Sequence, residues 1–402
     1  MKVKPLAGSV MILMLVTALS ACGGGQNAPP FTPNSIPKTL ALSAWGWGDN
    51  EFGQLGNGTT VNNLVPLKIE GLSDVVAISG GEYHSLALTS DGSVWAWGDN
   101  EFGQLGNGTT QDSTVPVKVS NLSDVTGIAA GQYHSLAVKS DGTVWAWGHN
   151  NYGQLGDKTT NDRYTPVQVI GLSKMTAVAA GFEYSVSLNY RGILWAWGFN
   201  DFGQLGDGSN VDRHTPVQVN LDPSDDTVTA FACGYYQTIA VIKNNSVRVW
   251  GANTSFDFGG GAWINSNSPI PISGLSGVKA VAGGYYHMAF LKSDGTVWMV
   301  GQNGYGQLGN GTITDSFTMT PVQVSSLSGV SAIATGAYHT IALRQDGTVY
   351  TWGWNQYGQL GDNSTSISSV PVEVLDSGGI NYLNGVIAIA GGAYHSIALT
   401  NP

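Results

Sequence analysis

Short apolar runs alternate with Gly, Asn, Asp and Ser along most of the chain. One unit begins with Val-Pro-Val-Lys-Val at Val115 and continues with apolar runs over 125–130, 134–139 and 144–148. Runs of this length, rich in β-branched and aromatic residues, are typical of β-strands, and no helical period intervenes. The Asp-Gly pair at Asp141 tolerates the positive φ of a tight hairpin turn. Each unit therefore predicts a four-stranded antiparallel meander.

The unit recurs at a nearly fixed interval. The sequence Phe/Tyr-Gly-Gln-Leu-Gly begins at six positions: Phe52, Phe102, Tyr152, Phe202, Tyr305 and Tyr357. A seventh, degenerate (worn) copy runs from Phe256 to Gly260. From the Leu of one copy to that of the next, with Phe258 standing in the worn copy, the intervals are 50, 50, 50, 53, 50 and 52 residues. A constant period near fifty indicates a repeat architecture.

Tryptophan pairs show how the units pack. Trp95 and Trp97 are two residues apart in a predicted strand, so both side chains face the same side, and three other units carry a similar pair. A single four-stranded sheet cannot bury rings of this size, so neighbouring sheets must stack on them. Radial stacking of such sheets is a β-propeller. Each unit also has a Pro in its first apolar run, as at Pro116, which places that strand at a sheet edge.

The two ends of the chain complement each other. The chain stops after the run 393–399, where earlier units continue into a Trp-containing strand, and that missing strand is present near the N-terminus over 42–48. The sequence therefore predicts an all-β fold over residues 39–402: a seven-bladed β-propeller of four-stranded antiparallel blades, in which the N-terminal strand closes the last blade.

The first residues have the features of an export signal. Lys2 and Lys4 precede a short apolar run, and Leu-Ser-Ala-Cys closes it at Cys22. This ending resembles a bacterial lipobox, which implies a signal peptide over 1–21, lipidation of Cys22 and an extracytoplasmic protein attached to the cell envelope, at the outer membrane if the cell has one. The Gly/Pro-rich stretch 22–38 is expected to be a tether.

Charge narrows the choice of partners. The formal net charge of the chain is −11, and loss of the two lysines within residues 1–21 lowers it to −13. A nucleic-acid partner is not expected, because phosphate binding requires a basic surface. Apart from Cys22 only Cys233 remains, in a position where other units carry Ala or Gly, so we expect a small buried residue and no internal disulfide.

The full repeat reads G-x-Y-H-S-L-A-L-x-x-D-G-x-V-W-x-W-G-x-N-x-x-G-Q-L-G-x-G and resembles the regulator of chromosome condensation family. The resemblance covers residues 39–400 and implies a seven-bladed propeller. The founding member exchanges nucleotide on a small GTPase by means of a basic tail and a blade insertion, and this chain has neither, so exchange activity is not expected. A photoreceptor of the family carries Trp where this chain has Gln132, and no repeat here has Trp in that position. Another exported relative inhibits β-lactamases through aromatic loop residues.

No catalytic, cofactor or metal site is predicted. Five histidines occupy one repeat position, as at His84, and residues held one per blade cannot converge on a single ion, so we expect them to make structural hydrogen bonds inside the blades. His149 and His214 have no Ser, Cys or carboxylate partner at a recognisable spacing, which argues against a hydrolytic triad.

Positions that differ between repeats are the candidates for recognition. The residue after the Gly of G-x-Y-H is aromatic in three consecutive repeats, and three further aromatic residues occupy variable positions: Phe182, Tyr235 and Tyr285, then Phe199, Trp263 and Trp354. Aromatic side chains are common anchors of protein interfaces. We expect a protein-binding module that uses one face of the ring. A carbohydrate-binding propeller and a secreted enzyme inhibitor remain alternatives.

Overall fold

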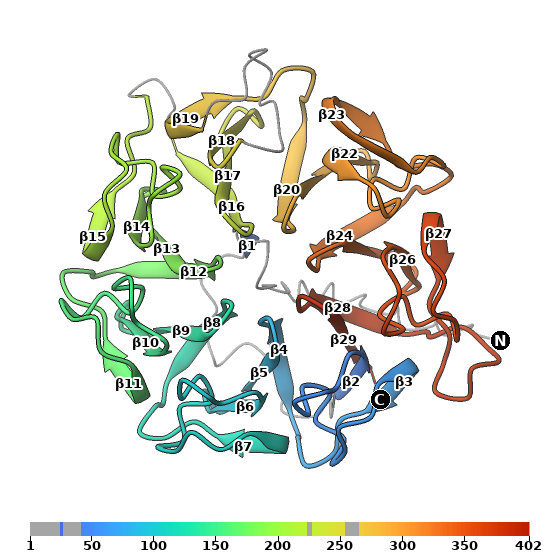
Figure 1. Cartoon of the computed structure of the whole chain (residues 1–402), viewed down its shortest axis with the longest axis horizontal. Coiled ribbons are helices and arrows are strands. Elements are labelled where there is room, and N and C mark those ends of the chain that lie inside the picture. The colour runs from blue at the N-terminus through green and yellow to red at the C-terminus, as the bar shows by residue number, and fades with distance from the viewer. Residues whose placement is uncertain (1–24, 27–41, 223–226, 254–264, 402) are drawn as a thin grey trace, which may run out of the picture.

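The computed structural model describes residues 25–26, 42–222, 227–253 and 265–401. Seven four-stranded antiparallel blades surround a central axis, and one of them gains a fifth strand (Figure 1). The first strand of each blade lies nearest the axis: β4 (Val75–Gly80), β8 (Val125–Ala130), β12 (Met175–Ala180), β16 (Val228–Cys233), β20 (Val278–Gly283), β24 (Val330–Thr335) and β28 (Val386–Gly391). The predicted fold class is confirmed.

The remaining strands follow outward in each blade. The second strands begin at the repeated His position: β5 (His84–Thr89), β9 (His134–Lys139), β13 (Tyr184–Asn189), β17 (Gln237–Ile242), β21 (His287–Lys292), β25 (His339–Arg344) and β29 (His395–Thr400). The third strands each contain at least one Trp: β2 (Ser43–Gly48), β6 (Val94–Gly98), β10 (Val144–Gly148), β14 (Leu194–Gly198), β18 (Val247–Gly251), β22 (Val297–Asn303) and β26 (Val349–Gly353).

The fourth strands contain the prolines and lie at the outer edge of each sheet, as predicted, because Pro cannot donate a ladder hydrogen bond. They are β3 (Asn63–Lys68), β7 (Ser113–Lys118), β11 (Arg163–Gln168), β15 (Arg213–Gln218), β19 (Ser266–Pro271), β23 (Thr314–Gln323) and β27 (Ser368–Glu373).

The N-terminal strand closes the ring. β2 pairs antiparallel with β29, with Ser43 opposite Thr400 and Gly48 opposite His395, so the last blade combines both ends of the chain. This confirms the closure expected from the sequence. A further two-residue strand, β1 (Gly25–Gln26), pairs with the inner strand β16. Its two residues belong to the stretch 22–38, which we expected to be a tether.

Tryptophan joins one blade to the next. Trp147 is fully buried and its indole Nε1 donates a 2.8 Å hydrogen bond to the carbonyl of Gln104 in the preceding blade. The ring lies on Gly106, whose φ is +63° and where an added Cβ would lie 2.7 Å from that indole nitrogen. Trp145, the other member of the pair, packs against the same cluster but is only partly buried. Only Gly fits this contact, which explains the second Gly of Gly-Gln-Leu-Gly.

The repeated His position links all seven blades into a ring. His84 Nε2 lies 2.9 Å from Ser135 Oγ of the next blade. Six equivalent links complete the circle: His134 to Ser185, Tyr184 to Gln237, Gln237 to Gly284, His287 to Thr340, His339 to Ser396 and His395 to Ser85. The predicted structural role is confirmed, although the bonds run between blades and not within them.

Burial controls the chemistry of these groups. It lowers the pKa of each of the five ring histidines to about 3, so they are neutral near pH 7. Cys233 is also fully buried and free, as predicted, and burial raises the pKa of its thiol to about 12. Among the residues that the structure describes, no helix is long and apolar enough to cross a membrane.

Candidate functional site

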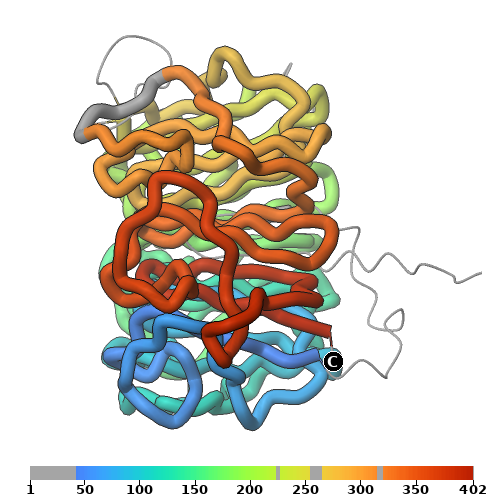
Figure 2. Tube along the Cα trace, turned by 90° about the vertical axis from the view of Figure 1, so that its right-hand side faces the viewer, coloured from blue at the N-terminus to red at the C-terminus, as the bar shows by residue number. Residues whose placement is uncertain are grey.

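The two ends of the ring differ. One end, which we call the loop face, contains the turns between first and second strands and the long loops between third and fourth strands, such as 99–112. Seen from the side, these long loops lie on the left and the C-terminus lies on the right (Figure 2). Asn100 holds its loop by donating to the carbonyls of Thr109 and Gln111 and by accepting from the Leu105 N–H. This repeated Asn therefore has a structural role in the loop.

The turns nearest the axis are joined by their backbones. In six of the seven turns, the residue after the Gly of G-x-Y-H donates its backbone N–H to a backbone carbonyl of the next blade, with N···O distances of 2.9–3.3 Å. The pairs are Gln132 to Gly181, Phe182 to Tyr235, Tyr235 to Gly284, Tyr285 to Ala337, Ala337 to Ala393 and Ala393 to Gly81. The side chains at this position thus form an inner circle around the axis. These bonds use no side-chain atoms, so the identity of each side chain is free to vary.

Five of the six predicted aromatic residues belong to one continuous set of ring contacts. Phe182 and Tyr235 have centroids 4.2 Å apart, and Tyr235 and Tyr285 are 4.1 Å apart. Phe199 joins through Tyr236, and Trp354 joins through Tyr338. We call the rings connected in this way the aromatic patch. Trp263 lies outside the described residues, as does the worn repeat copy at 256–260.

The members of the aromatic patch are not equally accessible. Tyr285 is only 6% exposed, whereas Phe182, Tyr235, Phe199 and Trp354 are half-buried. Tyr285 therefore supports the surface from beneath, and the other four rings present part of one side to solvent. Their role in binding stays a prediction.

The patch also contains residues that the sequence did not single out. The Tyr of G-x-Y-H is half-buried beside the axis in six blades. In five of these blades its ring is connected to the aromatic patch: Tyr83, Tyr236, Tyr286, Tyr338 and Tyr394. The sixth, Tyr133, contacts Phe102 and His149. Repetition suggested scaffold, yet these side chains lie at the surface. The signal that could have identified them is their type, because a core position in a blade rarely needs a hydroxyl.

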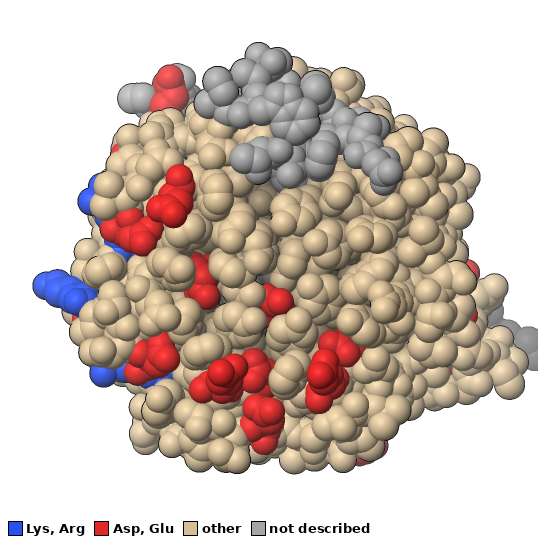
Figure 3. Space-filling view, viewed as in Figure 1, with Lys and Arg blue, Asp and Glu red and all other residues tan. Residues whose placement is uncertain are grey.

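Charge divides the loop face into two halves. In the four blades from β2 to β15, the loops and turns of this face contain twelve carboxylates: Asp49, Glu51, Glu82, Asp99, Glu101, Asp112, Asp157, Asp162, Glu183, Asp201, Asp207 and Asp212. The described loops of the other blades contain only Asp362. Figure 3 looks onto this face and shows red side chains over one part of it and almost none over the rest. The acidic half borders the aromatic patch.

Glu82 lies where the two halves meet. It is 7% exposed, and burial raises the pKa of its carboxyl to about 7, although Tyr285, Gln132 and Tyr83 each favour the ionised form. Burial raises the pKa values of tyrosines from several blades, and the negative charge of Glu82 adds a smaller contribution in the same direction: Tyr83, Tyr133, Tyr235 and Tyr338. Glu82 follows Gly81, whose carbonyl accepts from the Ala393 N–H in the inner circle, so this carboxyl belongs to a turn beside the axis.

One prediction about this face is wrong. His149 does have a carboxylate partner, because its Nδ1 lies 3.0 Å from Glu183 Oε1 in the axial turn of the next blade. Burial disfavours the charged form of His149, but the hydrogen bond to Glu183 and the negative charge of Glu183 outweigh burial and raise the pKa of His149. Gln154 also donates to this carboxylate. Both members of the pair are less than a tenth exposed. No nucleophile is hydrogen-bonded to His149 among the described residues, so the pair orders the loop.

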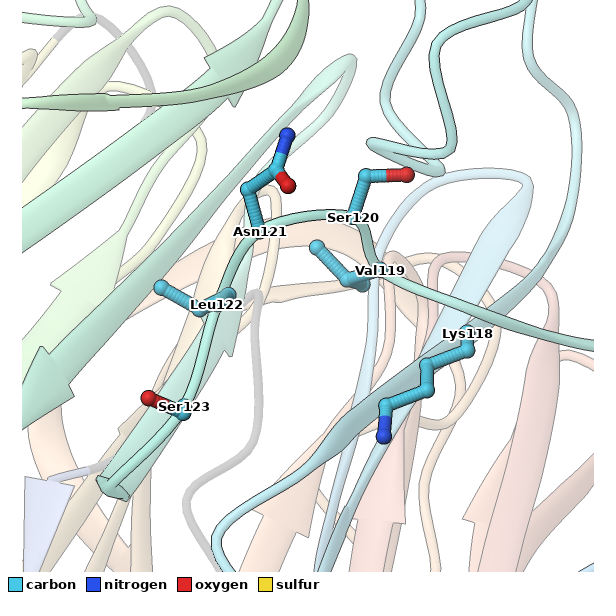
Figure 4. A pocket seen from close by; sticks show the side chains of 6 residues that line it. All are labelled: Lys118, Val119, Ser120, Asn121, Leu122 and Ser123. Carbon is cyan, nitrogen blue, oxygen red and sulfur yellow. The ribbon is translucent and has the colours of Figure 1, made fainter.

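Other features of the described chain add no chemistry. No group of three or more His, Cys, Asp or Glu within it could hold a metal ion. An open hollow of about 460 Å³ lies at the opposite end of the ring, along residues 118–123 between β7 and β8 (Figure 4). Its lining has one charged side chain, Lys118, and no convergent polar groups. The loop face therefore remains the candidate site.

Comparison with known proteins gives consistent matches. Residues 173–402 match the RCC1-like domain, and residues 43–88, 91–138 and 141–188 match the regulator of chromosome condensation (RCC1) repeat. The ultraviolet-B receptor UVR8 of Arabidopsis thaliana is 34% identical over 180 residues, which are 43% of this chain and 39% of the receptor. The E3 ubiquitin-protein ligase HERC2 of Homo sapiens is 35% identical over 180 residues, 42% of this chain and 4% of the ligase. The chain thus spans less than half the length of these curated relatives.

A solved structure supports the fold. Prp20p from Saccharomyces cerevisiae superposes with a TM-score of 0.80 at 22% sequence identity, over 91% of this chain and 93% of that chain. At this identity the likeness shows the shared architecture and no more. Function has to be argued from the loop face itself.

Proposed function

Because the chain belongs to the RCC1-like domain family, a family of propellers, we propose that it is a binding module that recognises another protein through the loop face. The observation that carries this proposal is the aromatic patch, a continuous set of half-exposed rings on one face of a rigid ring. Exposed rings with little conformational freedom are the anchors that protein interfaces use most. The related Prp20p has been characterised for binding to Gsp1p and histones, so this architecture serves protein recognition elsewhere.

Nucleotide exchange is not part of the proposal. The loops of this face that the structure describes, which exclude residues 254–264, have similar lengths and contain no protruding insertion. A carbohydrate ligand would use the same rings and is a second outcome of the test below. The acidic half favours a protein, since carboxylates on a rigid face complement a basic protein surface.

We further propose that the protein works outside the cytoplasm, attached by lipid on Cys22. The sequence before Cys22 supports this, and these residues lie outside those that the structure describes. Replacing Cys22 by Ala in the full chain should release the protein from the membrane fraction. Unchanged membrane association of the variant would contradict the anchor without affecting the binding proposal.

The binding proposal is tested with surface rings on the two ends of the molecule. The full chain serves as bait under crosslinking, beside a variant carrying Phe199→Ser and Trp354→Ser. The matched control carries Tyr190→Ser and Ile380→Ser, which remove exposed apolar side chains from the opposite end of the ring (54% and 83% exposed). Loss of the captured protein in the first variant alone supports the proposal. Equal capture by both variants, or capture of a glycan that free sugar displaces, contradicts it.

A further inference from the structure

The axial part of the loop face combines two buried acceptors with aromatic walls. Glu82 Oε2 and Gln132 Oε1 are both buried, and neither oxygen has a donor at hydrogen-bond distance among the described residues, although Tyr285, Gln132 and Tyr83 lie near enough to the Glu82 carboxyl to favour its ionised form. Each side chain is 7% exposed, and the two come from adjacent blades. Buried polar atoms are nearly always satisfied in native proteins, so a pair of unsatisfied acceptors side by side indicates a donor that the protein chain does not supply.

Aromatic rings surround these two acceptors. Tyr83 and Tyr394 have centroids 5.7 Å apart, and Tyr394 is 6.5 Å from Tyr285. Ala337 and Ala393 occupy the inner circle between Tyr285 and Glu82, and both are fully buried. These two small residues leave the space across which Tyr285 interacts with Glu82. We call Glu82, Gln132, Tyr83, Tyr285 and Tyr394 the axial mouth.

The charges near the axial mouth favour a cation. Glu183 lies in the axial turn two blades after that of Glu82, and in addition to burial its negative charge raises the pKa of Glu82. His149 is a basic group beside the axial turn of Glu183, and it is paired with that carboxylate. The cationic side chains that begin β11 and β15 are paired as well: Arg163 with Asp157 and Arg213 with Asp207, each at 2.6 Å. No described Lys or Arg forms an ion pair with Glu82, so its charge is available to a ligand.

We propose that the axial mouth binds an arginine side chain of the partner protein, an inference that rests on the proposed function and specifies its partner. A guanidinium is planar, carries five donors in a fixed fork and stacks on aromatic faces. It therefore satisfies a carboxylate oxygen and an amide oxygen at once while its plane lies against Tyr83 or Tyr394. A lysine ammonium offers a point charge without the plane, and a neutral side chain leaves the negative charge of Glu82 without a counter-charge.

The test uses small probes and the full chain at pH 8. Nα-acetyl-arginine N-methylamide is titrated against Nα-acetyl-citrulline N-methylamide, its neutral isostere, and against the lysine analogue, with protein fluorescence and calorimetry as readouts. Three proteins are compared: the natural chain, Glu82→Gln, and Glu101→Gln as the control that removes an exposed carboxylate from the same face. We expect at least tenfold tighter binding of the arginine probe than of either other probe, retained in E101Q and lost in E82Q.

Two results overturn the inference: equal binding of the arginine and citrulline probes to the natural chain, or an unchanged preference in E82Q. Equal binding of the lysine probe contradicts the guanidinium assignment. Failure here is distinguishable from failure of the proposed function. If E82Q still captures the crosslinked partner while the Phe199 and Trp354 variant does not, the arginine site is refuted and protein binding through the loop face stands.

Discussion

Replacing Glu82 by Gln should stabilise the unliganded protein, and the gain should grow with pH. Glu82 is 7% exposed, and burial raises its pKa from 4.5 to about 7. A carboxyl whose folded pKa is raised contributes stability that is complete below its unfolded pKa and is lost as pH rises through its folded pKa. Gln does not ionise, so the variant escapes this loss while keeping the shape of the side chain.

The magnitude follows from the pKa difference. About 2.5 pKa units at 1.36 kcal/mol each give roughly 3 kcal/mol of destabilisation of the natural chain once Glu82 is fully ionised. Between pH 5.5 and pH 8, the stability advantage of E82Q should therefore grow by about 2 kcal/mol. The difference between the two proteins isolates this effect, because every other titrating group is common to both.

Urea denaturation of the natural chain and of E82Q at half-unit pH steps measures this difference. Glu101→Gln is again the control, since Glu101 is exposed on the same face and its removal should give a pH-independent change within about 0.5 kcal/mol. A constant offset between E82Q and the natural chain across the range would refute the reasoning. It would mean that the axial carboxyl is solvated and that its unpaired oxygen carries no information about a ligand.

Three further predictions concern the ring itself. His339→Gln introduces the side chain that Gln237 provides at the same position of another blade. Burial lowers the pKa of His339 from 6.5 to about 3, so the stability that neutral His339 contributes is present above pH 6.5 and is lost as the pH falls toward 3. Between pH 6 and 4 the unfolding free energy of the variant should therefore fall less steeply than that of the natural chain, by up to about 1.4 kcal/mol per pH unit, and equal slopes would contradict this. Gly106→Ala should lower the free energy of unfolding by about 1–3 kcal/mol more than Gly71→Ala does. Both glycines have a positive φ, but only at Gly106 would an added Cβ meet an indole ring. Equal effects of the two changes would argue against that contact. Deleting residues 23–48 removes β2 and should greatly lower the thermal midpoint, whereas the same melting curve would contradict closure by β2.

Much of the fold could be predicted because its determinants recur along the chain. The period of about fifty residues, the edge prolines and the strand missing at the C-terminus each specify one feature of a closed ring. The His position shows the limit of this reasoning. Its structural role followed from one residue per blade, but the partner, Ser135 for His84, becomes visible only when blades are placed side by side.

The His149–Glu183 pair was missed for a related reason. In the preceding blade, Gln104 donates to Asp99 in its own long loop, whereas Gln154 donates to Glu183 of the next axial turn. The carboxylate has thus moved to the neighbouring blade, and His149 occupies the Asp position. The available signal was a pair of departures from the repeat: His149 stands where the preceding unit has Asp99, and Glu183 stands where most units have Tyr. The spacing of 34 residues between them matches no familiar motif.

The contact across the axis between Glu82 and Tyr285 could not be predicted from the sequence, because it depends on the absence of large side chains at the same position of the two intervening blades. Glu82 and Tyr285 are brought together by closure of the ring and by the small size of Ala337 and Ala393. The backbone bonds of the inner circle hold these turns whichever side chain is present. A symmetric scaffold can therefore support an asymmetric face, since substitutions at these positions change recognition without disturbing the bonds between blades. It follows that the repeated residues determine the propeller, and that the partner is determined by the few positions at which the repeats disagree.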